Sequence, residues 1–120
     1  MGIKQSVEDL INRMQGGDIL GAFDTHYADD VVMQEPAGTH EGKPANRERE
    51  QQFLDSVKEW KSLNFANVAI DDQGDHGTAF IEYDFDFINT DGQPVRYEQV
   101  SRQTWKDGKI VHERFYYNAS

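Results

Sequence analysis

The chain has 120 residues and no cysteine, which is enough length for one domain with its own core and excludes disulfide and thiol chemistry. Its 22 acidic and 12 basic residues give a formal net charge of −10, and such a surface repels the phosphate backbone of nucleic acids. Because there is no apolar signal region and no apolar run near the ~20 residues of a membrane span, we expect a cytoplasmic protein that binds neither nucleic acid nor membrane.

The first predicted element is an amphipathic helix that begins near Ser6 and ends at Gly16-Gly17. Four apolar residues recur at the spacing of one helix face: Val7, Leu10, Ile11 and Met14. Ser6 followed by Asp9 is a weak N-cap signal. Asp18 then caps a second, shorter helix. The apolar stripe of that helix is Ile19, Leu20, Phe23 and Tyr27.

A strand over residues 31–35 follows a turn at Asp29-Asp30 and carries the best functional lead in the chain. Val31, Met33 and Glu35 share one face of this strand because strand side chains alternate. The first two are apolar, so Glu35 is directed toward the core. A buried glutamate is costly unless it has a partner or a task, which makes Glu35 the first candidate for a catalytic group.

Residues 36–44 are predicted to form a loop rich in Pro, Gly and Thr, and Pro44 suits the first turn of a third helix. This helix is predicted to run to about Lys61. The apolar residues on its buried side are Phe53, Val57 and Trp60. The charged run 47–50 is predicted to be its solvated face.

The second half of the chain is predicted to form strands joined by polar turns. The strands span residues 63–70, 78–88, 95–105 and 109–117. The second alternates most clearly, with one apolar face: Ile81, Tyr83, Phe85 and Phe87. Such alternation is typical of an antiparallel sheet with one face on the core. Helices followed by hairpins therefore predict one α+β domain over residues 1–120.

Several short motifs resemble the nuclear transport factor 2-like superfamily, most closely the SnoaL-like polyketide cyclases and the ketosteroid isomerases. These motifs are Gly17-Asp18, Tyr27-Ala28-Asp29-Asp30-Val31, Glu35-Pro36-Ala37-Gly38, Gly42 and Trp105-Lys106-Asp107-Gly108-Lys109-Ile110. The resemblance implies a cystatin-like, cone-shaped α+β barrel in which three helices pack in the concave face of a curved, mostly antiparallel sheet. Such an interior fills with side chains or holds a ligand.

The same resemblance places Glu35 where ketosteroid isomerases have their general base, an aspartate before a proline. Leu10 stands at the position of their first oxyanion donor, a tyrosine. Ser101 stands at the position of the second, an aspartate that donates a hydrogen bond as a neutral carboxylic acid. The chain therefore lacks both of those donors.

The face of the last strand that lines the interior depends on the turn at Lys106-Asp107-Gly108. A three-residue loop would pair Trp105 with Lys109, Gln103 with Val111 and Ser101 with Glu113. It would turn inward Val111, Glu113, Phe115 and Tyr117. A two-residue turn would instead turn His112 and Arg114 inward, because a slip of one residue exchanges the two faces. We favour the first, since its inward face is the more apolar.

The inward side of strand 95–105 is unusually polar for a core face, because it carries Gln99, Ser101 and Gln103. Two interpretations remain open. The strand lies at an edge or an interface and is wet on both sides, or it is a pocket wall with hydrogen-bonding groups set among aromatic side chains.

Three residues are predicted to be catalytic: Glu35, Glu113 and His40. Glu113 is the second inward carboxyl, and His40 follows Glu35 closely and belongs to the residue type best suited to proton transfer near neutral pH. The predicted ligand-binding residues are Leu10, Met14, Tyr27, Met33, Phe53, Trp60, Tyr83, Phe85, Tyr97, Gln99, Ser101 and Phe115. No histidine pair has metal-ligand spacing and no glycine-rich phosphate loop occurs, so we expect no metal and no cofactor.

The resemblance and the candidate residues predict a SnoaL-like isomerase or cyclase. In it Glu35, with its pKa raised by burial, would act as general acid/base on a small apolar or aromatic carbonyl substrate. The alternative is a non-catalytic module of the same fold that binds a small ligand or dimerises.

The outer sheet face predicts a homodimer. Its ionic residues are Glu82, Asp84, Asp86, Arg96, Glu98 and Arg102, with Val100, Ile110 and Tyr116 predicted beside them. Two strand registers are allowed, one pairing Asp86 with Arg96 and the other pairing Glu82 with Arg102. A charged sheet with apolar islands favours a self-complementary interface.

Overall fold

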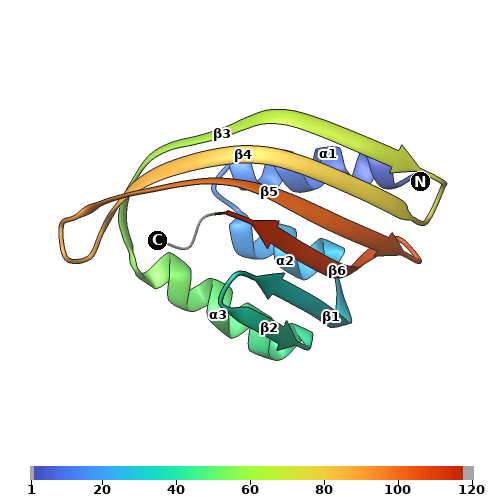
Figure 1. Cartoon of the computed structure of the whole chain (residues 1–120), viewed down its shortest axis with the longest axis horizontal. Helices are drawn as coiled ribbons and strands as arrows, with labels where there is room; N and C mark the ends of the chain where they lie inside the picture. Colours follow the sequence, from blue (N-terminus) through green and yellow to red (C-terminus); the bar gives the residue numbers. More distant parts are fainter. Residues whose placement is uncertain (1, 118–120) are drawn as a thin grey trace.

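The computed structural model describes residues 2–117. These residues form three helices and six strands (Figure 1). Their bounds are α1 (Ile3–Gln15), α2 (Ile19–His26), β1 (Tyr27–Glu35), β2 (Gly38–Glu41), α3 (Lys43–Asp55), β3 (Val57–Asp72), β4 (Gly77–Asn89), β5 (Pro94–Lys106) and β6 (Lys109–Tyr116). None of the helices in this part of the chain has the length and apolar character required to cross a membrane.

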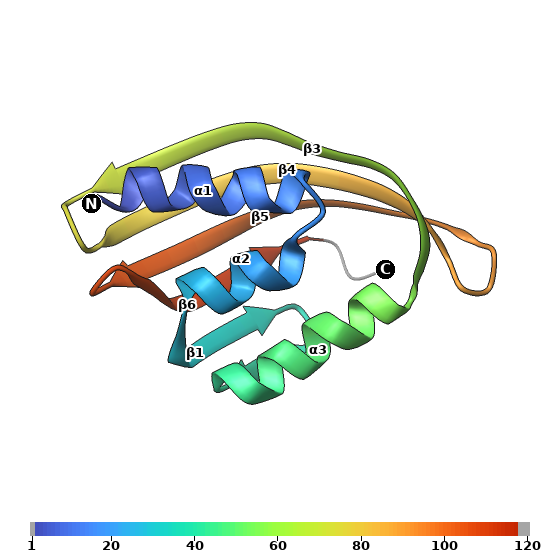
Figure 2. The ribbon, with the colours of Figure 1, turned by 180° about the vertical axis from the view of Figure 1, so that it is seen from behind.

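The strands form one sheet in the order β2-β1-β6-β5-β4-β3. All neighbouring strands are antiparallel except β1 and β6, which are parallel. All three helices lie on one side of the curved sheet (Figure 2). The predicted α+β cone is confirmed, but the sheet does not close into a barrel, because β2 and β3 remain its two edges.

The two N-terminal helices carry the predicted apolar stripes, with errors at two ends. Asp18 caps α2 as predicted, since its carboxylate accepts a hydrogen bond from the Gly21 amide at 3.0 Å. Tyr27 lies outside α2, and the predicted turn at Asp29-Asp30 is wrong, because all three residues belong to strand β1. The other error is at the first N-terminus. Helix α1 begins at Ile3 rather than near Ser6, and Ser6 is buried inside it. The predicted Ser6 cap is therefore wrong. Ile3 is almost fully buried and extends the apolar stripe by one turn, which favours the earlier start.

Helix α3 ends at Asp55 rather than near Lys61, so Val57 and Trp60 belong to strand β3. Val57 pairs with Asn89 and Trp60 with Phe87 across β4. β-Branched and aromatic residues suit a strand, and pairing with β4 overrides the helical spacing of these side chains. The loop prediction for residues 36–44 is also incomplete, because Gly38–Glu41 forms strand β2 against β1.

The β5–β6 turn contains two residues, and the predicted register is wrong. Lys106 pairs with Lys109, and Asp107 and Gly108 both have positive φ values, 53° and 74°, as a tight hairpin turn requires. Pairing then shifts between Thr104/His112 and Trp105/Ile110, which leaves Val111 as one extra residue on β6. The two-residue turn alone would direct Glu113 outward, but the extra residue at the bulge exchanges the two faces of β6 again. Glu113 therefore points inward as predicted, but it lies opposite Gln103 instead of Ser101.

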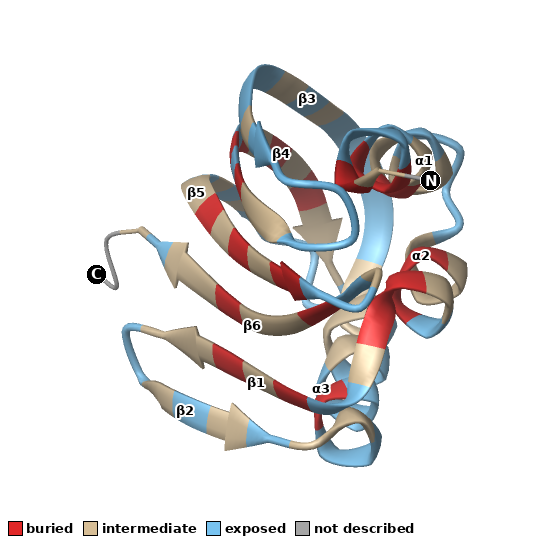
Figure 3. Ribbon diagram, turned by 90° about the vertical axis from the view of Figure 1, so that its right-hand side faces the viewer, coloured by how far each residue is buried: buried red, intermediate tan, exposed pale blue. Residues whose placement is uncertain are grey.

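The core lies between the concave sheet face and the helices (Figure 3). Buried and exposed residues alternate along β4, as predicted from its sequence. Strand β5 lies between β4 and β6, so the edge-strand interpretation is wrong and its inward polar side chains belong to the interior. Ile110 is completely buried opposite Trp105 and is therefore not part of the outer face.

The outer face has one of the two predicted registers. Asp86 pairs with Arg96, whose guanidinium lies 2.6 Å from the Asp86 carboxylate. At the other end of the face, Arg102 and Arg114 are direct cross-strand neighbours. No ion pair within residues 2–117 involves either arginine. The face thus has an acidic end and a separate basic end, beside the exposed Phe80.

We predict that this face forms a homodimer, because a two-fold axis would bring the basic end of one copy to the acidic end of the other. Arg102→Glu should weaken association by placing an acid against acids. Sedimentation at low and at high salt checks this, and high salt should also weaken the wild-type dimer.

Lys4→Glu is the matched control, since it makes the same charge change on α1, away from the sheet's outer face. It should leave association unchanged. A strict monomer at both salt concentrations and tens of micromolar protein would contradict the prediction.

Candidate active site

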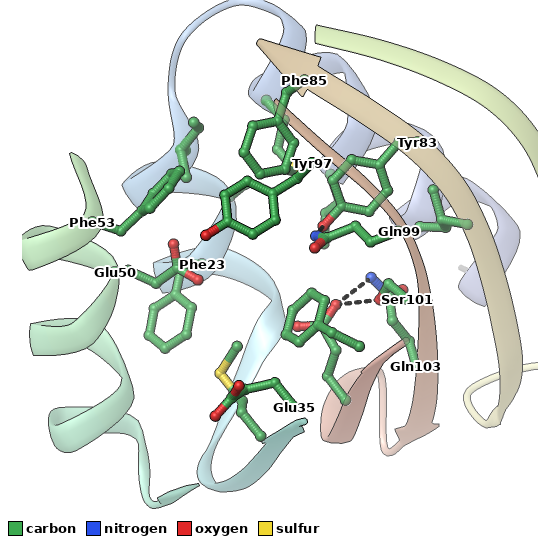
Figure 4. A pocket seen from close by; sticks show the side chains of 18 of the residues that line it. Phe23, Glu35, Glu50, Phe53, Tyr83, Phe85, Tyr97, Gln99, Ser101 and Gln103 are labelled. Atoms are coloured by element: carbon green, nitrogen blue, oxygen red, sulfur yellow. Dashed lines mark hydrogen bonds between the residues drawn. The ribbon is translucent and has the colours of Figure 1, made fainter. Parts of the chain in front are cut away.

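A cavity of about 230 Å³ lies between the concave sheet face and the helices (Figure 4). All twelve residues predicted to bind a ligand lie on its lining, and so do Glu35 and Glu113. His40 does not line it, but contacts Glu35 from behind. Whether these residues bind a ligand stays a prediction.

Glu113 on β6 is the most enclosed carboxyl of the cavity, with 2% of its surface exposed. Its Oε1 accepts a hydrogen bond from the Tyr27 hydroxyl at 2.5 Å. Its Oε2 accepts from the Ser101 hydroxyl at 2.6 Å and from the Gln103 amide at 3.2 Å. Trp105 Nε1 donates to Gln103 Oε1 and so orients that amide. Burial raises the pKa of Glu113, and the three donors offset this only in part.

Glu35 ends strand β1 and occupies a more polar part of the lining. Its Oε2 accepts from the Ala37 amide at 2.9 Å and from the Tyr117 hydroxyl at 3.0 Å. Its Oε1 lies 3.2 Å from His40 Nε2 and 3.9 Å from Arg49 Nη2. Burial raises the pKa of Glu35, but these partners outweigh it and hold the pKa below its ordinary value. The expectation of a raised pKa is wrong for this residue.

Glu50 on α3 is the cavity carboxyl that sequence reasoning missed. The charged run 47–50 is predicted as a solvated face, yet Glu50 and Arg49 both line the cavity. Burial, together with the negative charge of Glu113, raises the pKa of Glu50 to about 7, although Arg49 opposes the shift. The signal is present in the sequence, because Asn46, Arg49, Glu50 and Phe53 have the spacing of one helix face. The predicted stripe of Phe53, Val57 and Trp60 lies on this same face, so Glu50 is missed because a charged run is assigned to solvent.

Aromatic rings form most of the remaining wall. Phe53 on α3 meets Phe85 edge to face at 5.9 Å, and Tyr97 stacks on Phe85 at 5.2 Å. Gln99 donates a hydrogen bond to the Tyr83 hydroxyl at 2.6 Å, which places a polar pair beside these rings (Figure 4). The pocket-wall interpretation of strand 95–105 is therefore supported by its position, since Gln99, Ser101 and Gln103 all line the cavity.

The arrangement suits acid–base chemistry on a small apolar molecule. Three carboxyls converge on one aromatic cavity in different electrostatic surroundings. Among residues 2–117, no group of three or more acidic or histidine side chains is arranged to hold a metal ion.

The sequence profile of the SnoaL-like domain matches residues 7–113. The chain belongs to the SnoaL-like domain family. That family includes polyketide cyclases and isomerases, and the resemblance to the nuclear transport factor 2-like superfamily is confirmed. Comparison with proteins of curated function gives no match.

Solved structures share this SnoaL-like fold over nearly the whole chain. A Mesorhizobium loti protein described as a SnoaL-like polyketide cyclase, with carbohydrate phosphatase as a further description, is 29% identical, with a TM-score of 0.76 over 98% of this chain and 100% of its own. A nuclear transport factor 2-like protein from Salmonella enterica serovar Typhimurium is 20% identical, with a TM-score of 0.79 over 98% of this chain and 92% of its own. A Bacillus subtilis protein described as an isomerase is 20% identical, with a TM-score of 0.72 over 95% of this chain and 84% of its own. The last two likenesses concern the fold alone.

Glu50→Gln should remove a decrease in the free energy of unfolding that the wild-type protein shows as pH rises from about 4.5 to about 7. The pKa of Glu50 rises from 4.5 to about 7 on folding, so the folded chain keeps a proton that the unfolded chain has lost between these values. Wild-type stability should therefore fall relative to the variant as pH rises through this range, by about 1–3 kcal/mol after allowance for partial exposure. Urea unfolding at about pH 5 and about pH 8 measures the difference.

Glu48→Gln is the control, because it removes a carboxylate from the exposed side of the same helix. It should keep the wild-type pH dependence. Equal pH dependence in all three proteins would contradict the raised pKa of Glu50.

Proposed function

We propose that this chain is a SnoaL-like isomerase or cyclase that moves a proton next to a carbonyl group in a small apolar or aromatic substrate. The observation that carries the proposal is the presence, in one aromatic cavity, of a carboxyl with a lowered pKa, Glu35, and two with raised pKa values, Glu50 and Glu113. Carboxyls whose surroundings separate their pKa values are suited to opposite roles in proton transfer.

Glu35 is proposed as the general base. A base must be ionised at the working pH, and the partners of Glu35 hold it in that form. It must also reach the substrate, and Glu35 lines the cavity while His40, Tyr117 and the Ala37 amide fix its orientation. The rotation of this carboxylate is thus restricted before a substrate arrives.

The group around Glu113 is proposed to orient the substrate. Tyr27 and Ser101 donate their hydroxyl protons to Glu113, so their oxygens are fixed in the lining and can accept hydrogen bonds from a substrate. The similarity to the Mesorhizobium loti protein described as a polyketide cyclase supports the same class of reaction. A carbonyl compound with an aromatic or alicyclic body fits this division of polar and apolar walls.

The alternative is a non-catalytic module that binds a small ligand or serves in dimerisation. It is favoured by Leu10 and Ser101, which occupy the places of the two ketosteroid isomerase oxyanion donors. Leu10 is buried and apolar and donates no hydrogen bond from its side chain.

Exchange of α-hydrogens for deuterium tests the proposal without knowledge of the natural substrate. We expect the wild-type protein to accelerate deuterium incorporation from D₂O into at least one member of a panel of aromatic and alicyclic ketones, followed by proton NMR. Glu35→Gln should lower the protein-dependent rate by at least ~100-fold, the usual contribution of a general base.

Glu41→Gln, which removes an exposed carboxylate from β2, should retain the wild-type rate. An unchanged rate in Glu35→Gln would remove Glu35 from the mechanism. No acceleration by the wild-type protein with any ketone that binds would favour the non-catalytic alternative.

A further inference from the structure

We propose that Glu50, in its neutral form, donates a hydrogen bond from its carboxyl group to the carbonyl oxygen of the molecule bound in the cavity. The inference rests on the proposed function and names a further catalytic residue for it. It supplies from helix α3 the donor that Leu10 and Ser101 do not provide at their positions.

The position of Glu50 carries the first part of the argument. Helix α3 presents Asn46, Arg49, Glu50 and Phe53 to the cavity. The Glu50 carboxyl points into the cavity from the wall formed by α3, whereas Glu35 comes from the wall formed by β1 (Figure 4). A ligand in the cavity can therefore meet carboxyls from two different elements.

The hydrogen-bonding state of the three cavity carboxyls carries the second part. Glu35 and Glu113 each accept several hydrogen bonds from side chains or backbone. No hydrogen bond within residues 2–117 uses the carboxyl of Glu50. Asn46, one turn earlier on α3, has a buried Oδ1 that also lacks a partner in this part of the chain. The α3 wall thus has a carboxyl whose hydrogen-bonding capacity is available to a ligand.

The surrounding groups determine the protonation state of the Glu50 carboxyl. The titratable or charged groups that share the cavity with it are Arg49 on α3, Tyr27 and Glu35 on β1, Tyr83 on β4, Tyr97 on β5, Glu113 on β6 and Tyr117 after β6. Burial and Glu113 raise the pKa of Glu50 to about 7, while Arg49 lowers it. Arg49 also lies 3.9 Å from Glu35, so its positive charge interacts with both carboxyls. A large neutral fraction of Glu50 therefore exists at neutral pH.

The two carboxyls complement each other in the proposed reaction. Glu35 accepts the proton as the α C–H bond breaks, and the electron pair of that bond moves through the carbon skeleton to the carbonyl oxygen. The neutral Glu50 carboxyl donates its hydrogen bond to this oxygen as negative charge develops there. Glu35 then returns the proton to a carbon atom, and the carbonyl re-forms. No oxidant or reductant is consumed.

Binding of 2-acetylnaphthalene, a neutral aromatic ketone, tests the role of Glu50. Its affinity for the wild-type protein should fall at least about fivefold between about pH 6 and about pH 8.5, because ionised Glu50 has no proton to donate. In Glu50→Gln the affinity should be independent of pH, since the amide keeps an N–H donor but does not titrate. Glu48→Gln should behave as wild type, and circular dichroism confirms that each variant is folded.

2-Ethylnaphthalene, which has no carbonyl group, separates hydrogen bonding from a general effect of charge in the cavity. Its affinity should change less with pH than that of the ketone. The inference is overturned if the ketone does not bind, if its affinity does not depend on pH, if Glu50→Gln keeps the dependence, or if the hydrocarbon shows an equal dependence. Each of these results leaves the role of Glu35 to the deuterium-exchange measurement, so the two proposals fail separately.

Discussion

The hydrogen-bonded burial of the Glu113 carboxyl is the constraint on which the rest of the cavity depends. A buried carboxyl needs partners, because a buried polar group left without its hydrogen bonds costs about 1–3 kcal/mol, and more if it is charged. The partners come from two other strands: Tyr27 from β1, and Ser101 and Gln103 from β5. They converge only because β1 runs parallel to β6 and because the bulge at Val111 brings Glu113 opposite Gln103. The fold and the polar end of the cavity are therefore specified by the same contacts.

Glu113 also sets the electrostatics of the wall that faces it. Its charge adds to burial in raising the pKa of Glu50, whereas Glu35 lies among donors that lower its own pKa. The cavity is consequently asymmetric, with an ionised carboxylate on β1 and a carboxyl near its midpoint of titration on α3. Phe53, Phe85 and Tyr97 line the same cavity, and apolar surroundings strengthen the effect of these groups on a bound ligand.

The amino-acid sequence predicts those features that depend on local periodicity. The alternation of Ile81, Tyr83, Phe85 and Phe87 defines the inward face of β4, and Asp18 marks the start of α2. Errors arise where pairing with a distant strand decides the outcome. Trp60 fits a helical stripe but lies opposite Phe87 in the sheet, and nothing local at Val111 identifies it as the bulged residue. Glu50 is missed for a different reason. It shares a helix face with Phe53, but a charged run is predicted to face solvent, and only the fold shows that this face of α3 lines a cavity.

The cavity shifts the pKa values of two carboxyls in opposite directions, lowering that of Glu35 and raising that of Glu50. Carbon-13 NMR titration of the glutamate side-chain carboxyls, assigned with Glu35→Gln and Glu50→Gln, measures this directly. We predict a titration midpoint of about 7 for Glu50 and a midpoint below the ordinary 4.5 for Glu35. Midpoints at the ordinary glutamate value for both residues would contradict this prediction.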